Sequence, residues 1–468
     1  MAHAIPLLPP RQAPNSILAL ALVAVLGMPA AVRADEVSPP FKLIRSEEDY
    51  SYLADPARRI DFDDRLKYIR LGDTNYMSLG GELRERFDSY DAPRFGIGSS
   101  KDSYVLQRVL LHADAHIDER VRVFVQLGRE DAFDKAKPYS VSDADNIDLQ
   151  NGFVDVLADP ERHLTLRLGR QEIAFNAAQR FVSVREGPNV RQSFDGVRAT
   201  WAQEAIRLDA FATRPVSYRP GSFDDRGDSS QRFYGLDLSY QIAGGQSLET
   251  YAVEIDRRQV RFGSLTGDER RHSFGIRLAG KEDGFDHDAE AVYQTGTFGD
   301  REIRAWAIGL IGGFTFTSPG SPRAGLEFDA GSGDRHPGGG RLETFNPMFP
   351  KGAYFNESAL TSWANLMMLR ASVTVQPSSS TSMSASVAER WRQTGNDAVY
   401  LQPYIPLAAT LGNSERRVGE AYQYDASWRA TRYLTFTAEA LHQAAGPAIR
   451  LAGGRSVTFV MFIGQLRF

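Results

Sequence analysis

Arginines at every second position carry the clearest chemical signal in this sequence. In the segment 76–88, Arg84 and Arg86 take one parity, whereas the apolar Leu83 and Phe87 take the other. The same pattern recurs along the chain and assigns one polar face to Arg84, Arg86, Arg108, Arg122, Arg167, Arg198, Arg207, Arg277, Arg370, Arg390 and Arg467. A guanidinium presents a planar fork that binds carboxylates through two parallel hydrogen bonds. A ring of such groups around a pore favours anions.

Carboxylates share this polar face with the arginines. They are Glu82, Asp114, Asp155, Asp209, Asp237, Asp288, Glu290 and Glu327. Two interpretations follow from the mixture. Either the two signs neutralise one another in a wet lumen, or the arginines outnumber the acids at a constriction and select anions.

The two-residue period predicts β-strands with one apolar and one polar face. Mean hydropathy is −0.35, and the segments between turns are about ten residues long, as in transmembrane barrels. After residue 34 no apolar run reaches the roughly 18 residues that a membrane-spanning helix needs. We therefore predict an all-β fold, a transmembrane antiparallel barrel with short periplasmic turns and long extracellular loops.

Turn chemistry sets the expected number of strands at about eighteen. Eight short turns are predicted at 118–120, 158–163, 202–205, 241–246, 281–286, 318–322, 377–380 and 429–432. An opening strand at 76–90 and a closing strand at 456–468 complete the count, with both termini on the periplasmic side. The opposite connections are expected at 91–102, 132–146, 176–193, 214–230, 256–270, 331–362, 393–417 and 443–455, with a short one near 297–302. Because the turns are short, any gate should come from these loops.

The N-terminal residues predict that the protein is secreted across the inner membrane. Residues 1–34 resemble a signal peptide: Arg11 precedes an apolar stretch, and Val32, Arg33 and Ala34 form a cleavage site before Asp35. The alternative, a membrane anchor, is disfavoured because the stretch is short. We assign 1–34 to the signal peptide, 35–75 to an N-terminal periplasmic segment and 76–468 to the barrel. Cleavage near Ala34 changes the net charge from −5 to −7. The predicted location is the outer membrane of a Gram-negative-type cell.

Sites for other chemistry are largely missing from the sequence. There is no cysteine, and the histidines after the signal (His112, His116, His163, His272, His287, His336 and His442) are scattered. No G-x-S-x-G motif, phosphate loop or nucleic-acid patch occurs. We predict no catalytic site, no cofactor and no nucleic-acid partner. Asp143, Asp145 and Asp148 remain a candidate calcium group, although the EF-hand spacing is absent.

Several stretches resemble the alginate-export family of outer-membrane barrels. They are 45–51, 66–72 leading into 79–87, the signature 166–173 with 179–181 and 193–198, and 325–334 with 344–350. The resemblance implies an eighteen-stranded monomeric barrel with an arginine-lined pore for a polyanionic uronate polymer. It transfers a pore role to Arg84, Arg86, Arg167 and Arg198. Gln171, Arg180 and Asp195 also match the signature, as pore residues or as structural braces of the loop.

The leading hypothesis is export or diffusion of an anionic polysaccharide such as alginate through a positively lined lumen. The pore-lining candidates are Arg84, Arg86, Arg108, Arg167, Arg198, Arg207, Arg277, Arg370 and Arg390. The alternatives are a general porin or one for small organic acids, then a receptor or adhesin that uses its loops, then a barrel enzyme. The expected partners are the anionic solute, outer-membrane lipids and periplasmic polymer-secretion proteins.

Overall fold

The structure is a computed structural model that describes residues 39–118, 120–159, 163–263 and 265–468. The predicted signal peptide, 1–34, and positions 35–38 lie outside the described residues. Residues Phe41–Phe468 belong to one compact unit.

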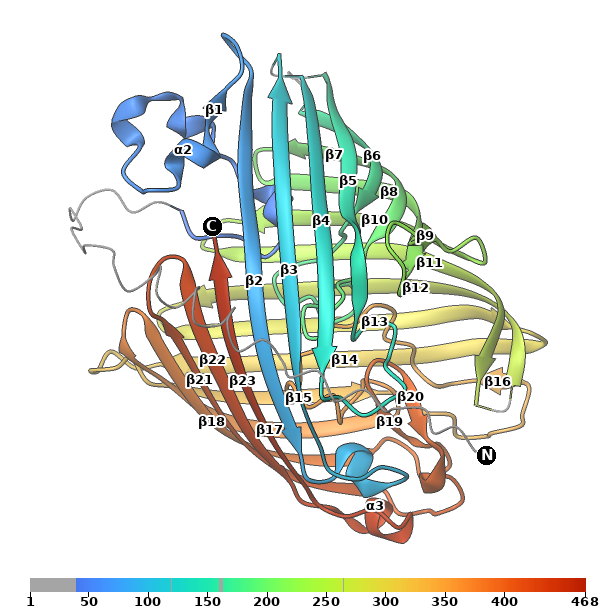
Figure 1. Ribbon diagram of the computed structural model, residues 1–468. Helices are drawn as coiled ribbons and strands as arrows, with labels where there is room; N and C mark the ends of the chain where they lie inside the picture. The colour runs from blue at the N-terminus through green and yellow to red at the C-terminus, as the bar shows by residue number, and fades with distance from the viewer. Residues whose placement is uncertain (1–38, 119, 160–162, 264) are drawn as a thin grey trace, which may run out of the picture. The chain divides into compact units, whose positions relative to one another are not determined.

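Eighteen antiparallel strands form a closed barrel (Figure 1), as predicted. They are β2 (Tyr76–Tyr90), β3 (Asp102–Ile117), β4 (Val121–Phe133), β5 (Asp145–Asp159), β6 (Leu164–Gln171), β7 (Phe194–Gln203), β8 (Ile206–Ser217), β10 (Gln231–Ile242), β11 (Gln246–Phe262), β12 (Leu265–Glu282), β13 (Phe285–Phe298), β14 (Arg301–Thr315), β15 (Arg323–Gly331), β17 (Leu366–Ser378), β18 (Thr381–Arg392), β21 (Arg417–Arg429), β22 (Leu434–Gln443) and β23 (Val457–Arg467). Each pairs with the next along the chain. The ring closes where β2 pairs with β23, with Leu83 opposite Leu466.

Shorter elements decorate the barrel. The helical turns are η1 (Arg45–Glu47), η2 (Ser51–Ala54), η3 (Pro56–Arg58), α2 (Asp64–Lys67), η4 (Pro93–Gly96), η6 (Ala408–Thr410) and α3 (Pro447–Leu451). The short strands are β1 (Ile69–Arg70), β9 (Arg226–Gly227), β16 (Arg341–Leu342), β19 (Val399–Leu401) and β20 (Ile405–Leu407). No helix among the described residues has the length and hydropathy to cross a membrane.

The eight predicted short turns all join consecutive barrel strands at one end, which we call the turn end. The gaps between those strands are 118–120, 160–163, 204–205, 243–245, 283–284, 316–322, 379–380 and 430–433. The opposite connections, at the loop end, include long segments at 172–193, 332–365 and 393–416. Turn residues therefore located the strand boundaries correctly, because each marks the point where the two-residue alternation must stop.

One predicted loop, 256–270, is wrong. These residues continue β11 to Phe262 and begin β12 at Leu265, so that the two strands form a long hairpin. Beyond the apolar belt, the outward face of this hairpin is polar: Arg270 Nε lies 3.6 Å and His272 Nδ1 lies 3.2 Å from the Glu254 carboxylate. The inward face is charged as well, because Glu269 and Arg271 are buried there and pair at 2.6 Å. With polar residues on both faces, this segment lacks the alternation that marks a lipid-facing strand.

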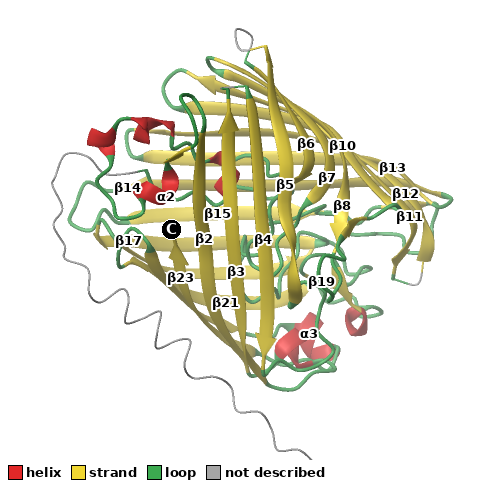
Figure 2. Ribbon diagram, turned by 45° about the horizontal axis from the view of Figure 1, so that its top comes forward, coloured by secondary structure: helices red, strands yellow, loops and turns green. Residues whose placement is uncertain are grey.

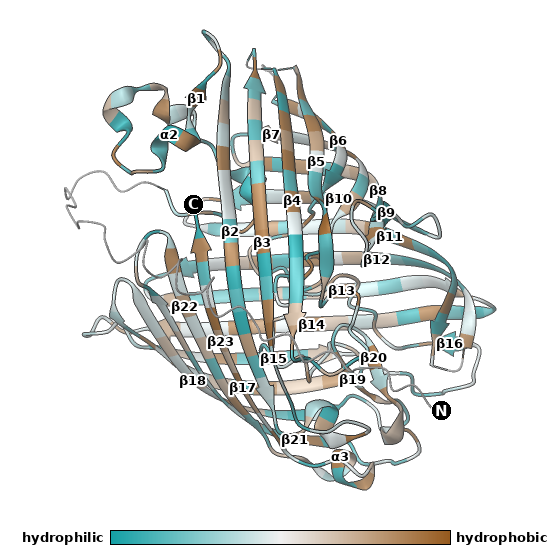
Figure 3. Ribbon diagram, viewed as in Figure 1, coloured by the Kyte–Doolittle hydropathy of each residue, from teal (hydrophilic) through white to brown (hydrophobic). Residues whose placement is uncertain are grey.

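Elsewhere the outward face carries a belt of exposed apolar side chains. On β12, Phe274, Ile276 and Leu278 are 52%, 53% and 43% exposed, and Leu236 and Leu238 of β10 are exposed as well. Figure 3 shows apolar and hydrophilic residues alternating along the barrel strands. Such a belt is what a barrel presents to lipid.

Neighbouring positions on β18 provide a test of this assignment. Ala385 is exposed on the outward face, whereas Ser386 lines an inner cavity. Ala385→Arg is expected to lower the free energy of unfolding by about 2–4 kcal/mol, because the guanidinium would lie in hydrocarbon. Ser386→Arg, the control, should lower it by less than about 1 kcal/mol, since the charge stays in water. Urea unfolding in lipid vesicles measures both, and equal losses would contradict the assignment.

Candidate functional site

Two loop-end connections fold into the barrel and meet there (Figure 2). We call 172–193 the first lumen loop and 332–365 the second lumen loop. The Phe349 N–H donates to the Phe181 carbonyl at 3.0 Å, and the Ser183 N–H donates to the Phe349 carbonyl at 2.9 Å. The two loops therefore form one hydrogen-bonded unit inside the barrel. That a gate comes from these loops stays a prediction.

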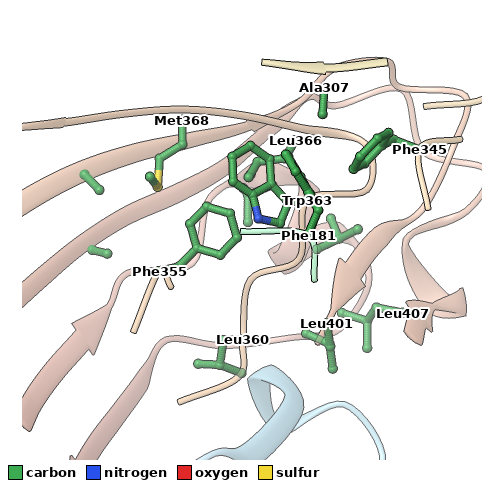
Figure 4. Packing of buried hydrophobic residues seen from close by; sticks show 14 of the residues in the cluster. Phe181, Ala307, Phe345, Phe355, Leu360, Trp363, Leu366, Met368, Leu401 and Leu407 are labelled. Carbon is green, nitrogen blue, oxygen red and sulfur yellow. The ribbon is translucent and has the colours of Figure 1, made fainter. Parts of the chain in front are cut away.

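An apolar cluster holds the crossing together (Figure 4). Trp363 is 1% exposed, and its ring centroid lies 4.8 Å from that of Phe181 and 5.3 Å from that of Phe355. Phe345 packs edge-on against Phe181, and Ala307 of β14 belongs to the same cluster. Burial of aromatic side chains on this scale favours a single arrangement of the two loops. The sequence did not indicate this cluster, because the alternation predicts a polar side chain at every inward position.

The first lumen loop is anchored to the wall by one half-buried carboxylate, that of Glu186. Arg108 donates to it, while Arg84 NH1 lies 3.6 Å and Arg191 Nε lies 3.4 Å from its oxygens. Burial alone would raise the pKa of the Glu186 carboxyl, but the Arg108 and Arg191 guanidiniums lower it below its ordinary value. The carboxylate therefore stays charged and links three arginines.

Arg84 and Arg86 also bind the backbone of the lumen loops. Arg84 NH1 donates to the Glu186 carbonyl at 2.7 Å, and Arg86 NH1 donates to the Gly187 carbonyl at 3.0 Å. Arg86 further contacts the Glu357 carboxylate at 2.6 Å. The structure thus places Arg84, Arg86 and Arg108, all predicted to line the pore, between the wall and the loops.

Arg180, a residue of the family signature, braces the opposite wall. Its NH1 donates to Asp288 at 2.8 Å and to Glu290 at 3.1 Å, and its Nε donates to the Tyr354 hydroxyl at 2.9 Å. Asp195 pairs instead with Arg170, which explains how an arginine is tolerated on the parity of its lipid-facing neighbours.

Five further predicted arginines lie on the wall and are paired with acids. Arg167 binds Asp155, Arg198 and Arg207 bind Asp209, Arg277 binds Asp288, and Arg370 binds Glu327. Arg198 is 12% and Arg207 is 49% exposed, against 4% for the Asp209 side chain they share. Arg167 and Arg370 are also more exposed than their acids, whereas Arg277 is less exposed than Asp288. In most of these pairs the guanidinium faces the lumen and the carboxylate lies deeper.

Several buried or half-buried cations form no ion pair with any described residue, and three of them are relevant to the lumen. Two are on the lumen loops, Arg185 and Lys351, and the third is Arg390 on β18, which donates to the Thr361 hydroxyl. Arg185 and Lys351 flank the point where Gly187 of the first loop touches the second loop. Burial lowers the pKa of both groups. A desolvated, unpaired cation is a strong local attraction for an anion.

Sequence reasoning identified Arg390 but missed Arg185 and Lys351. Both lie in loops, where alternation gives no information on orientation. The only available signal was their position beside the family motifs at 179–181 and 344–350.

A segment before the first barrel strand occupies the turn-end mouth. Arg45 donates to the Gly81 carbonyl at 3.0 Å and to the Phe468 carbonyl at 2.9 Å, and the Leu43 carbonyl accepts from Arg191 at 3.0 Å. Burial lowers the pKa of the Lys67 ammonium to about 8. Counting turns could not reveal this segment, because it is not a connection between strands.

The candidate calcium group is split by the structure. Asp143 contacts Lys135 Nζ at 2.6 Å and accepts from the Ser140 N–H, whereas Asp145 and Asp148 lie against another loop.

Comparison with known proteins agrees with this geometry. A sequence model of the family described as alginate export matches residues 75–462. A comparison with curated proteins finds no match.

Among solved structures, the fold is similar to several outer-membrane proteins of low sequence identity. OccK9 (OpdG) of Pseudomonas aeruginosa is 14% identical with a TM-score of 0.59, covering 84% of this chain and 98% of that one. OccAB1 of Acinetobacter baumannii is 11% identical with a TM-score of 0.59, covering 87% and 99%. OccK2 (OpdF) of Pseudomonas aeruginosa, in complex with glucuronate, is 11% identical with a TM-score of 0.54, covering 84% and 96%.

Removal of the central carboxylate tests the role of the lumen loops. Glu186→Gln leaves three guanidiniums without their shared anion, a change that costs about 3–5 kcal/mol for a buried pair. We expect a larger mean conductance and more frequent transitions in single-channel recordings, because the first lumen loop loses its anchor. Glu302→Gln, which breaks an exposed pair with Arg304, is the control. Identical recordings from the two variants would show that Glu186 does not hold the loop.

Proposed function

This chain belongs to the alginate-export family and has the fold of an outer-membrane channel, and from that premise we propose that it passes anionic, uronate-type carbohydrate through its lumen. The observation that carries the proposal is the pair of unpaired cations, Arg185 and Lys351, at the crossing of the two lumen loops. The exposed guanidinium of Arg207 and the partly exposed one of Arg198 extend the positive surface toward the turn end.

Uronates fit this lining for a chemical reason. Each uronic acid sugar carries one carboxylate, which a guanidinium binds in a bidentate manner, and several hydroxyls, which can bond the acids on the same wall. Because the wall arginines already have acidic partners, a passing carboxylate exchanges one partner for another. Binding is then weak enough to permit release, which conduction requires. The glucuronate bound by OccK2 shows that a channel of similar fold accepts a single uronate.

Whether the solute is a polymer or a small acid depends on the two lumen loops. Family membership favours a polysaccharide such as alginate. The packing of Trp363 against Phe181 favours a small organic acid, because a polymer requires the loops to separate. We place the polymer first and the small acid second.

Reversal of the two loop charges tests the anion preference. In water a unit charge about 6 Å from a passing ion contributes roughly 0.7 kcal/mol, or about threefold. Arg185→Glu combined with Lys351→Glu is therefore expected to reduce the ratio of anion to cation permeability by at least about tenfold. Reversal potentials in planar bilayers under a salt gradient measure the ratio.

Arg335→Glu is the matched control, because Arg335 lies in the second lumen loop but is exposed. A cation-selective native channel, or a double variant that matches this control, would overturn the proposal.

Block of the chloride current by added uronates of different length tests the size of the solute. If the channel passes a polymer, long polyuronate added on the turn side should block the chloride current, and Glu186→Gln should shorten each block because the loops part more easily. If the solute is a small acid, glucuronate should reduce the current in a saturable manner while long polyuronate has no effect. Neutral dextran of matched length is the control for simple obstruction.

A further inference from the structure

We propose that Asp148, Asp224 and Asp225, together with Asp145, bind a calcium ion at the loop end of the barrel and so fix the 218–230 loop to the start of β5. Three of these residues offer carboxylate oxygens that all lie within 4.8 Å of one another: Asp148, Asp224 and Asp225. Oxygens bound to one calcium ion are at most about 5 Å apart, since each bond is about 2.3–2.6 Å long.

Asp145 supplies the independent observation that points to a cation. Its side chain is buried, with the residue only 6% exposed, and its Oδ1 accepts no hydrogen bond from any described residue. Its carboxyl group lies within hydrogen-bonding reach of that of Asp225. Two ionised carboxylates repel each other, so oxygens this close require a shared proton or a bound cation between them. Asp224 Oδ1 is likewise buried without a partner in the described part of the chain.

The protein itself supplies little positive charge here. Among the described residues, Arg170 is the one cation that forms an ion pair with this group, with NH1 3.8 Å from Asp148, and its Nε and NH2 are committed to Asp195 at 2.7 Å and 3.1 Å. Four carboxylates therefore face one guanidinium that is already paired. Removing that many charges from water is unfavourable without a cation.

A second acidic group, formed by Asp61, Asp63 and Asp64, shows the contrast. Its carboxylates contact the Arg432 guanidinium, and the Tyr433 hydroxyl donates to Asp63 at 2.8 Å. That group carries its own cation, whereas the loop-end group does not.

The backbone is arranged for an ion that joins two segments. Asp148 Oδ2 accepts from the N–H groups of Asp224 and Asp225, at 2.8 Å and 3.2 Å, and the Phe223 N–H donates to the Ile147 carbonyl at 3.2 Å. The Leu149 N–H donates to Asp148 Oδ1 at 2.6 Å and the Arg219 N–H donates to Asp225 Oδ1 at 2.7 Å, so backbone N–H groups fix the positions of both carboxylates. Hard oxygen ligands of this kind select calcium over softer metals, and extracellular sites work at about 10⁻⁴–10⁻³ M.

Calorimetric titration of the purified full-length channel in detergent with CaCl₂ tests the proposal. We expect one site per chain with a dissociation constant of about 10⁻⁴–10⁻³ M. Asp224→Asn combined with Asp225→Asn should weaken binding at least about tenfold. Asp143→Asn, whose carboxylate pairs with Lys135, should leave it unchanged. MgCl₂ at equal concentration should bind more weakly, because magnesium requires a stricter geometry.

Limited proteolysis gives a readout that does not depend on heat of binding. Arg226 is exposed in the loop, and calcium should slow tryptic cleavage after it in the native protein and in Asp143→Asn but not in the double variant. Heat-dependent gel mobility shows that each barrel is folded. The proposal is overturned if the native protein binds no calcium, or if the double variant binds and is protected as well as Asp143→Asn.

Discussion

Closure of the sheet is the constraint on which every other feature depends. A strand in lipid cannot leave its backbone N–H and C=O groups unpaired, so the ring must close. Here the pairing of β2 with β23 completes it. Once the ring is closed, each side chain on a strand faces either the lipid or the lumen. The alternation in the sequence is the direct result, and the inner face can collect charges that would be intolerable on the outside.

A charged inner face creates a second requirement, because the guanidiniums and carboxylates on it must be satisfied. The chain meets it differently at the two ends. Toward the turn end, arginines pair with acids across neighbouring strands, as Arg167 does with Asp155, and still face water. Toward the loop end, Arg84, Arg86 and Arg108 use loop carbonyls and Glu186 instead, so that the charge of the wall holds the loops in place. The same residue type therefore lines the pore in one half and builds its constriction in the other.

The sequence predicted the parts of the fold that local chemistry determines. Short breaks in the alternation, several of them with Pro, Gly, Asp or Ser, marked all eight turns, and the parity of Leu83 and Phe87 against Arg84 and Arg86 set the faces of β2. It failed where a residue's surroundings depend on distant segments. The hairpin of β11 and β12 extends beyond the lipid belt with charged residues on both faces, which made 256–270 look like a loop. The destination of Arg108 likewise depends on Glu186, 78 positions later, which no local pattern reveals.

The loop cations follow from the same argument. A wall arginine acquires an acidic neighbour easily, because adjacent strands place residues side by side in a fixed register. A residue on a loop that crosses the lumen has no such register, and accordingly neither Arg185 nor Lys351 forms an ion pair within 4 Å of a described carboxylate. Charge that is left unpaired on a segment held in the lumen acts on whatever passes through it. Specificity is thus expected to reside in the two loops, while the wall supplies a screened background. In relatives with the same strands, exchange of residues in these loops is then sufficient to change the preferred solute without disturbing the barrel.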